Sequence, residues 1–100
     1  MNKNIKELIE YPREGILSKS VSSEGGADVT LFCMAKGAEM SEHTSTKQGL
    51  VYVIEGKGVF NLEGEEIAME PGIFIQMDQN AVHSLKADEN TAFLLTLIKR

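Results

Sequence analysis

Short segments of β-type residues, separated by turn residues, constrain the fold of this chain more than any other feature. Such segments at regular spacing are typical of antiparallel sandwiches and barrels. Nine of them within 100 residues predict an all-β fold that is closed or built from two sheets. We expect strands at Ile16–Val21, Val29–Met34, Met40–His43, Leu50–Ile54, Val59–Leu62, Glu65–Met69, Ile73–Gln76, Ala81–Leu85 and Ala92–Ile98.

A chain of this length has room for one hydrophobic core. Apolar residues make up 42% of it and charged residues 25%, which is ordinary for a globular protein. We therefore expect one domain over residues 1–100, with the barrel core at about 16–99. Residues 4–10 carry apolar side chains at helical spacing, but Tyr11-Pro12 follows them. They predict a short N-terminal arm with one or two helical turns on the outside.

The charged residues and the cysteine exclude several classes of partner and site. The net charge of −5 comes from acids scattered among lysines, and no basic stripe is present to neutralise phosphates, so we expect no nucleic acid partner. We find neither a signal-like start nor an apolar run that spans a bilayer, and expect no membrane association and a cytoplasmic location. Cys33, the only cysteine, shares the parity of Val29 and Leu31 and is predicted to be a buried core residue.

Two segments, Leu50–Ile54 and Phe93–Ile98, are apolar on nearly every residue. Both faces of such strands must be buried. One face fills the barrel, and the other needs the N-terminal arm or a second copy of the protein. We therefore expect a homodimer joined through this sheet, with Tyr52 at the interface because its parity is opposite to that of the inward-facing residues.

Two histidines, His43 and His83, carry the most concentrated chemistry of the sequence. Each lies at the end of a predicted strand, which suggests that their rings converge inside the barrel. Strand alternation puts Ser45 on the same face as His43, and Glu39 shares this parity if the strand is regular. Neutral imidazole is a good donor to transition metals. The predicted ligand pocket comprises His43, Ser45, Gln48, Val51, Val53 and His83, with His43 and His83 as metal ligands.

The spacing of glycines and histidines carries a family resemblance. In a first segment, His43 follows Gly37 after five intervening residues, and Gly56 closes the segment. A second segment begins at Gly72 and ends at His83. These positions match the two sequence motifs of the cupins, and the chain resembles that family over most of its length. The resemblance implies a double-stranded β-helix, or jelly-roll barrel, preceded by a short N-terminal arm.

The departures from the family concern the metal ligands. In metal-binding cupins three histidines and one glutamate usually hold a divalent ion. Here Ser45 stands at the place of the second histidine and Gly49 at that of the glutamate, with Gln48 beside it. The second motif departs from the family at Asp78, Asn80 and Ala87. The resemblance therefore implies a reduced two-histidine site for Zn, Fe, Mn, Ni or Cu, of modest affinity because water or substrate must supply the remaining ligands.

The sequence leaves three functional hypotheses open. The first is a small-molecule-binding cupin whose metal site supports oxidation, isomerisation or lysis of a small organic substrate. The second is a metal-free ligand-binding or sensor module in which the histidines and Ser45 hydrogen-bond a polar ligand. The third is a metal-free enzyme that uses His43 or His83 as its acid–base group. The identity of the substrate does not follow, because one fold hosts many chemistries.

Overall fold

The computed structural model describes residues 1–99, which form one helical turn and nine strands. Each predicted strand has a counterpart whose ends are shifted by no more than two residues, which confirms the all-β prediction. The elements are α1 (Ile5–Leu8), β1 (Ile16–Ser22), β2 (Ala27–Met34), β3 (Glu39–His43), β4 (Gly49–Glu55), β5 (Gly58–Leu62), β6 (Glu65–Met69), β7 (Phe74–Met77), β8 (His83–Ala87) and β9 (Thr91–Ile98).

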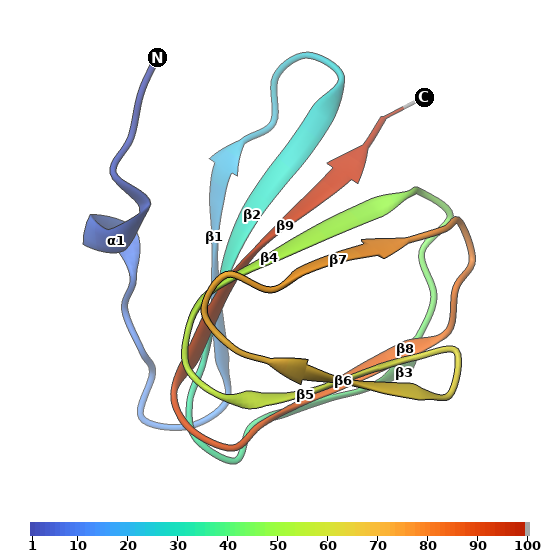
Figure 1. The fold of residues 1–100 in the computed structure, drawn as a ribbon. Coiled ribbons are helices and arrows are strands. Elements are labelled where there is room, and N and C mark those ends of the chain that lie inside the picture. The colour runs from blue at the N-terminus through green and yellow to red at the C-terminus, as the bar shows by residue number, and fades with distance from the viewer. Residues whose placement is uncertain (100) are drawn as a thin grey trace.

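The strands form two antiparallel sheets that face each other (Figure 1). One sheet has five strands in the order β1-β2-β9-β4-β7, and the other has four in the order β3-β8-β5-β6. Neighbours such as β2 and β9 come from distant parts of the chain. Two facing sheets whose neighbouring strands are joined by long crossing connections make a jelly-roll barrel.

The core lies between the two sheets, because alternate residues of each strand point inward. In β4, Val51 and Val53 are at most 1% exposed, whereas Tyr52 between them is 47% exposed. The fully enclosed part of this core comprises Met34, Val51, Val53, Phe60, Met69, Ile75, Met77, Ala81, Leu85, Ala87 and Phe93.

The N-terminal arm covers part of the outer face of the five-stranded sheet. Leu31, Cys33 and Ala92 are 0% exposed and pack beneath apolar side chains of the arm. This confirms the prediction that Cys33 is a core residue, and it explains how the first residues of β9 are buried on both faces. On β4 the outward-facing Tyr52 stays exposed. The Tyr11 hydroxyl donates a hydrogen bond of 2.7 Å to Glu55 Oε2 and so ties the arm to the end of β4.

The arm contains less helix than its apolar spacing would allow. Asn4 accepts a hydrogen bond from the Lys6 amide at 3.1 Å and caps α1, but the backbone is already extended at Ile9. The helical part is therefore a single turn. Across the described residues, no helix is both long and apolar enough to cross a membrane.

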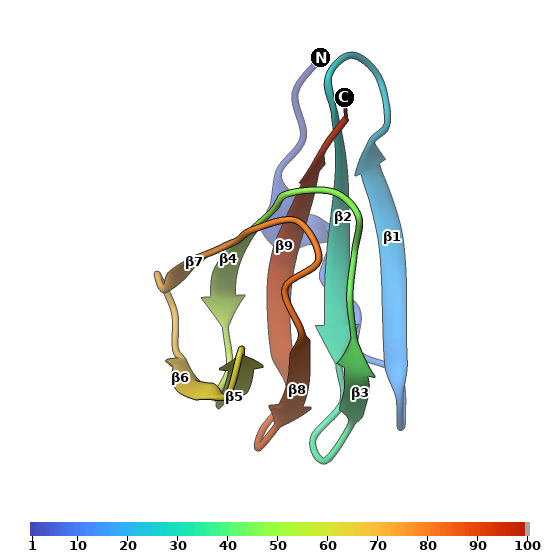
Figure 2. The same cartoon turned by 90° about the vertical axis from the view of Figure 1, so that its right-hand side faces the viewer.

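Two loops close one end of the barrel. The β3–β4 and β7–β8 loops run close together (Figure 2), and the Asn80 amide donates to the Ser45 carbonyl oxygen at 2.7 Å. Asn80 adopts φ 66°, as expected for an asparagine at a turn position that favours glycine. The histidine-bearing ends of β3 and β8 are thereby held side by side.

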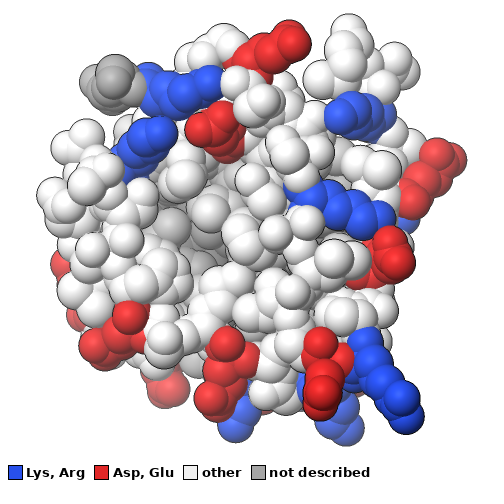
Figure 3. Space-filling model, turned by 180° about the vertical axis from the view of Figure 1, so that it is seen from behind, with Lys and Arg blue, Asp and Glu red and all other residues white. Residues whose placement is uncertain are grey.

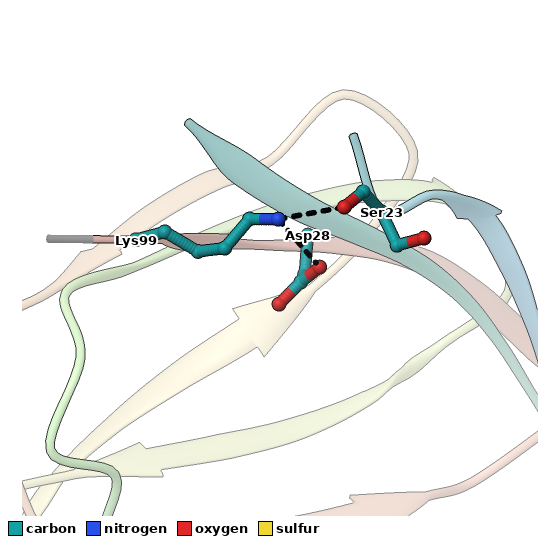
Figure 4. Close-up of polar contacts among 3 residues, drawn as sticks. All are labelled: Ser23, Asp28 and Lys99. Atoms are coloured by element: carbon teal, nitrogen blue, oxygen red, sulfur yellow. Dashed lines mark hydrogen bonds and ion pairs between the residues drawn. The ribbon is translucent and has the colours of Figure 1, made fainter. Parts of the chain in front are cut away.

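The last described residue ties β9 to the β1–β2 hairpin. Lys99 Nζ donates to the Ser23 carbonyl oxygen at 2.6 Å and lies 3.5 Å from Asp28 Oδ1 (Figure 4). The Lys99 amide also donates to the Gly26 carbonyl oxygen at 2.8 Å. Seen from behind, the molecule has an uncharged, hollowed centre with acidic and basic side chains around its rim (Figure 3).

Candidate functional site

A β-bulge in β3 sets the direction of the residues that precede His43. Met40 pairs with Leu85 and His43 with His83, so Ser41 and Glu42 together oppose Ser84 alone. The extra residue reverses the alternation, and Met40 and His43 both face the barrel interior. The parity argument for Glu39 is therefore wrong, since β3 is not regular: Glu39 is exposed, with its carboxylate 4.0 Å from Lys86 Nζ.

The bulge places the two imidazole rings side by side. The ring centroids of His43 and His83 are 4.0 Å apart, with an angle of 60° between the ring planes. His83 is 6% exposed, whereas His43 is exposed and connects the site to solvent. Phe60 packs parallel to the His83 ring, with a centroid separation of 5.8 Å. The convergence expected from the sequence is thus present in the geometry.

Each ring is anchored through the same nitrogen. His43 Nδ1 lies 2.7 Å from the Ser41 carbonyl oxygen, and His83 Nδ1 lies 3.0 Å from the Ala81 carbonyl oxygen. A carbonyl oxygen only accepts hydrogen bonds, so in the neutral rings Nδ1 carries the hydrogen and donates it. Nε2 of each ring is then left with a free lone pair. Both imidazoles are therefore arranged as metal donors or hydrogen-bond acceptors.

Burial keeps His83 in its neutral form. Desolvation lowers the pKa of His83 below its ordinary value of 6.5, and the nearby His43 lowers it further, while the hydrogen bond to Ala81 acts in the opposite direction. A neutral ring retains the lone pair on Nε2 near neutral pH.

A cavity of about 50 Å³ lies against the two rings. That volume holds a few water molecules, or a small part of a larger molecule that enters past His43. Its wall has no charged side chain, and apart from the imidazoles it is apolar. The lining residues are Phe32, Met40, His43, Val51, Phe60, Met77, His83, Leu85, Phe93 and Leu95.

The cavity is lined by only some of the residues that were predicted for the pocket. His43, Val51 and His83 line the cavity, whereas Val53 lies in the core and is 0% exposed. Ser45 and Gln48 are not among the lining residues, because β3 ends at His43 and strand alternation no longer applies beyond it. The Ser45 hydroxyl instead accepts a hydrogen bond from the Lys47 amide at 3.1 Å.

Methionine side chains contribute two of the lining residues of the cavity. Met40 had the wrong parity for the interior in a regular strand, and the bulge brings it in. Met77 approaches Gly49: a Cβ added to that glycine would lie 2.8 Å from Met77 Cε. The glycine in an otherwise apolar strand was the available signal for such a close approach.

The comparisons with known proteins agree with this architecture. Residues 30–99 match the family model described as "Cupin domain". The chain is a member of the cupin family. A conserved protein of unknown function from Streptococcus pyogenes superposes with a TM-score of 0.88 at 22% identity, over 100% of this chain and 88% of that one. A protein from Thermus thermophilus gives a TM-score of 0.88 at 22% identity, over 99% and 97% of the two chains.

A further solved cupin comes from a longer protein. The cupin 2 conserved barrel domain protein from Leptotrichia buccalis is 28% identical with a TM-score of 0.88, over 97% of this chain and 47% of that chain. Curated proteins gave no match to this sequence. The family model establishes the family, and the superpositions establish the fold. The chemistry of the site must be argued from its own residues.

The donor set determines how well this cupin suits a metal ion. Two free Nε2 atoms converge on one cavity, but among residues 1–99 no cluster of three or more histidine, cysteine, aspartate or glutamate side chains is placed to hold an ion. Carboxylate is absent from the cavity wall, so hard cations such as calcium do not fit. The set fits a borderline or soft transition metal that accepts neutral nitrogen donors.

Proposed function

We propose that this cupin binds a small organic molecule in its barrel, at a site formed by the Nε2 atoms of His43 and His83. A divalent transition metal ion held by the same two atoms would polarise an oxygen of the ligand and support its oxidation, isomerisation or lysis. The observation that carries the proposal is the shared anchoring of Nδ1 on backbone carbonyl oxygens at 2.7 and 3.0 Å. Metal-binding histidines use the same arrangement to orient the ring and fix the tautomer.

The surrounding side chains have separate roles in this proposal. Phe60 lies flat against His83 and keeps its ring in place. Phe32 and Phe93 stack on each other at 5.2 Å in the opposite wall and, with the aliphatic residues, keep bulk water from the buried ring. His43 is the solvent-exposed member of the pair, so a ligand enters past it. The binding site is open on one side and apolar on the others.

A second candidate function is metal-free binding of a ligand. The observation in its favour is that the cavity wall offers no third nitrogen or oxygen side chain. With both Nδ1 atoms already donating, each Nε2 can accept a hydrogen bond from a hydroxyl or amine of the ligand. An uncharged ligand with hydrogen-bond donors and an apolar body would suit this wall.

A zinc titration followed by calorimetry tests the first function. The chain contains two histidines, so His43→Ala and His83→Ala between them remove all imidazole. We expect the wild type to bind one ion and both variants to lose it. Glu39→Ala is the matched control, since this carboxylate on β3 points away from the cavity. Binding that is unchanged in both histidine variants would refute the metal site. Thermal stabilisation by small metabolites, insensitive to chelators and without zinc binding, would favour the metal-free function.

We also propose that the protein is a homodimer. Tyr52 and Phe74 face each other in the register of β4 and β7 and are 47% and 58% exposed. They continue the apolar surface that the N-terminal arm covers farther along the same sheet. Exposed aromatic pairs next to a buried apolar cluster are typical of protein interfaces. A second copy of the chain is the occupant that the apolar character of β4 and β9 favours.

A further inference from the structure

Four soft or borderline donors share the cavity between the sheets. Two are the imidazoles of His43 and His83, and two are the thioethers of Met40 and Met77. They come from β3, β7 and β8, so both sheets contribute. Thioether sulfur is a weak hydrogen-bond acceptor but a good ligand for soft metal ions. The remaining six lining residues are hydrocarbon.

Met77 lies where Gly49 leaves room. A Cβ on Gly49 would meet Met77 Cε at 2.8 Å and methyl groups of Leu95 and Leu97 at 3.5 Å. Gly49 is also the residue that the motif comparison placed at the family's glutamate position. The space beside the histidines that an acidic side chain would need is thus filled by the end of a methionine, and the local donor is a neutral sulfur.

Met40 reaches the cavity because of the β3 bulge. It stands three residues before His43, and the extra residue at Ser41–Glu42 turns both side chains to the interior. A single strand therefore presents one thioether and one imidazole to the same cavity. The side chain is half-buried, and its three rotatable bonds let the sulfur adjust its position.

The charge of the donors and the apolar wall favour a monovalent ion. All four donors are neutral, and no carboxylate at the cavity offsets a cation. The cost of transferring an ion from water to an apolar medium rises with the square of its charge, so a monovalent ion costs a quarter of what a divalent ion costs. Among the monovalent metal ions of biology, copper(I) is the soft ion that thioether ligands select.

We propose that the barrel cavity is a copper(I) site, with Nε2 of His43 and His83 and the thioether sulfurs of Met40 and Met77 as its donors. The inference rests on the proposed function, because it uses the same histidine pair. It adds two ligands, and with them a preference for monovalent copper over the divalent ions considered there. Copper(I) would occupy the site in the absence of any organic ligand.

Anaerobic competition with the copper(I) chelator bicinchoninate tests the two methionines. Met40→Leu, Met77→Leu and the double variant conserve volume and apolar character. We expect each single variant to lower copper(I) affinity by about tenfold or more, and zinc binding to stay the same. Met69→Leu is the matched control, because Met69 is 0% exposed in the same core cluster but does not line the cavity. It should bind copper(I) like the wild type.

The outcomes separate this inference from the proposed function. If the double methionine variant binds copper(I) as tightly as the wild type, the thioethers are packing residues and the inference is overturned, while zinc binding by the histidines still stands. If the histidine variants keep full zinc binding, the proposed function fails.

Selenomethionine-substituted protein gives a measurement that needs no variant to fold. The selenium-edge X-ray absorption spectrum of the copper(I)-loaded protein should show a copper neighbour for part of the selenium. A spectrum with carbon neighbours alone would overturn the inference.

Discussion

Thr91 offers a quantitative test of the fold, because its hydroxyl is buried at the corner where β4 passes into β5. The side chain is 0% exposed. Its Oγ1 accepts a hydrogen bond from the Lys57 amide at 3.1 Å, and it faces the carbonyl oxygens of Glu89 at 2.7 Å and Lys57 at 3.0 Å. A hydroxyl has one hydrogen, so Oγ1 donates to one of these two carbonyl oxygens at a time while it accepts from the Lys57 amide.

Thr91→Val keeps the shape of the side chain and removes both bonds. The Lys57 carbonyl oxygen keeps partners, since the Asp88 and Glu89 amides donate to it at 2.8 and 3.1 Å. The Lys57 amide loses the partner it has, and an unsatisfied, partly buried donor costs about 1–3 kcal/mol. We therefore expect the free energy of unfolding to fall by about 2 kcal/mol, and Tm by roughly 8–16 °C for a domain of this size.

Urea and thermal unfolding followed by circular dichroism measure this change. Thr91→Ser keeps the hydroxyl and deletes one methyl group, which costs about 1 kcal/mol. Thr96→Val, on the half-buried outer part of the same strand, should change stability by less than about 0.5 kcal/mol. The reasoning is refuted if the valine variant at Thr91 is as stable as the wild type or more stable than the serine variant.

Three further predictions concern the arm, a glycine and the outer sheet face. Burial, and then the hydrogen bond to Glu55, raise the pKa of the Tyr11 phenol above its ordinary value of 10.0. As the pH rises, the unfolded chain therefore loses this proton before the folded protein does. The stability advantage of the wild type over Tyr11→Phe, measured by urea titration, should be complete below about pH 10 and should shrink above it. A difference that stays constant with pH would contradict this linkage. Gly56 has φ 106°, and a Cβ there would overlap a backbone carbonyl oxygen, so Gly56→Ala should cost about 2–4 kcal/mol in the same assay. Gly64→Ala, with φ 85° and open space, should cost about 1–2 kcal/mol, and equal costs would count against the clash. Tyr52→Lys should convert a micromolar dimer into a monomer in sedimentation velocity, and a monomeric wild type would contradict the homodimer.

The sequence predicted the regular parts of the structure well, because alternation is a local property of a strand. Val51 and Val53 face the interior and Tyr52 the exterior, as their parity requires. The short helical arm followed from Pro12, and the buried Cys33 from its place among apolar neighbours. These outcomes depend on residues near one another in the chain.

The parts of the site that the sequence did not predict depend on long-range register. The bulge at Ser41–Glu42 is a feature of the pairing between β3 and β8, and the sequence of β3 alone does not indicate it. The inward turn of Met40 and the outward turn of Glu39 both follow from it. The expectation for Ser45 extended strand alternation beyond His43, and β3 ends at that residue. The contact between Met77 and Gly49 joins β7 to β4 and becomes visible only when the two strands are paired.

The most direct test of the histidine pair is long-range ¹H–¹⁵N NMR of the two imidazole side chains. In metal-free protein we expect the neutral form of both rings to carry its hydrogen on Nδ1, and one equivalent of zinc to shift both Nε2 signals together. Neutral rings protonated on Nε2, or a response confined to one ring, would contradict this expectation.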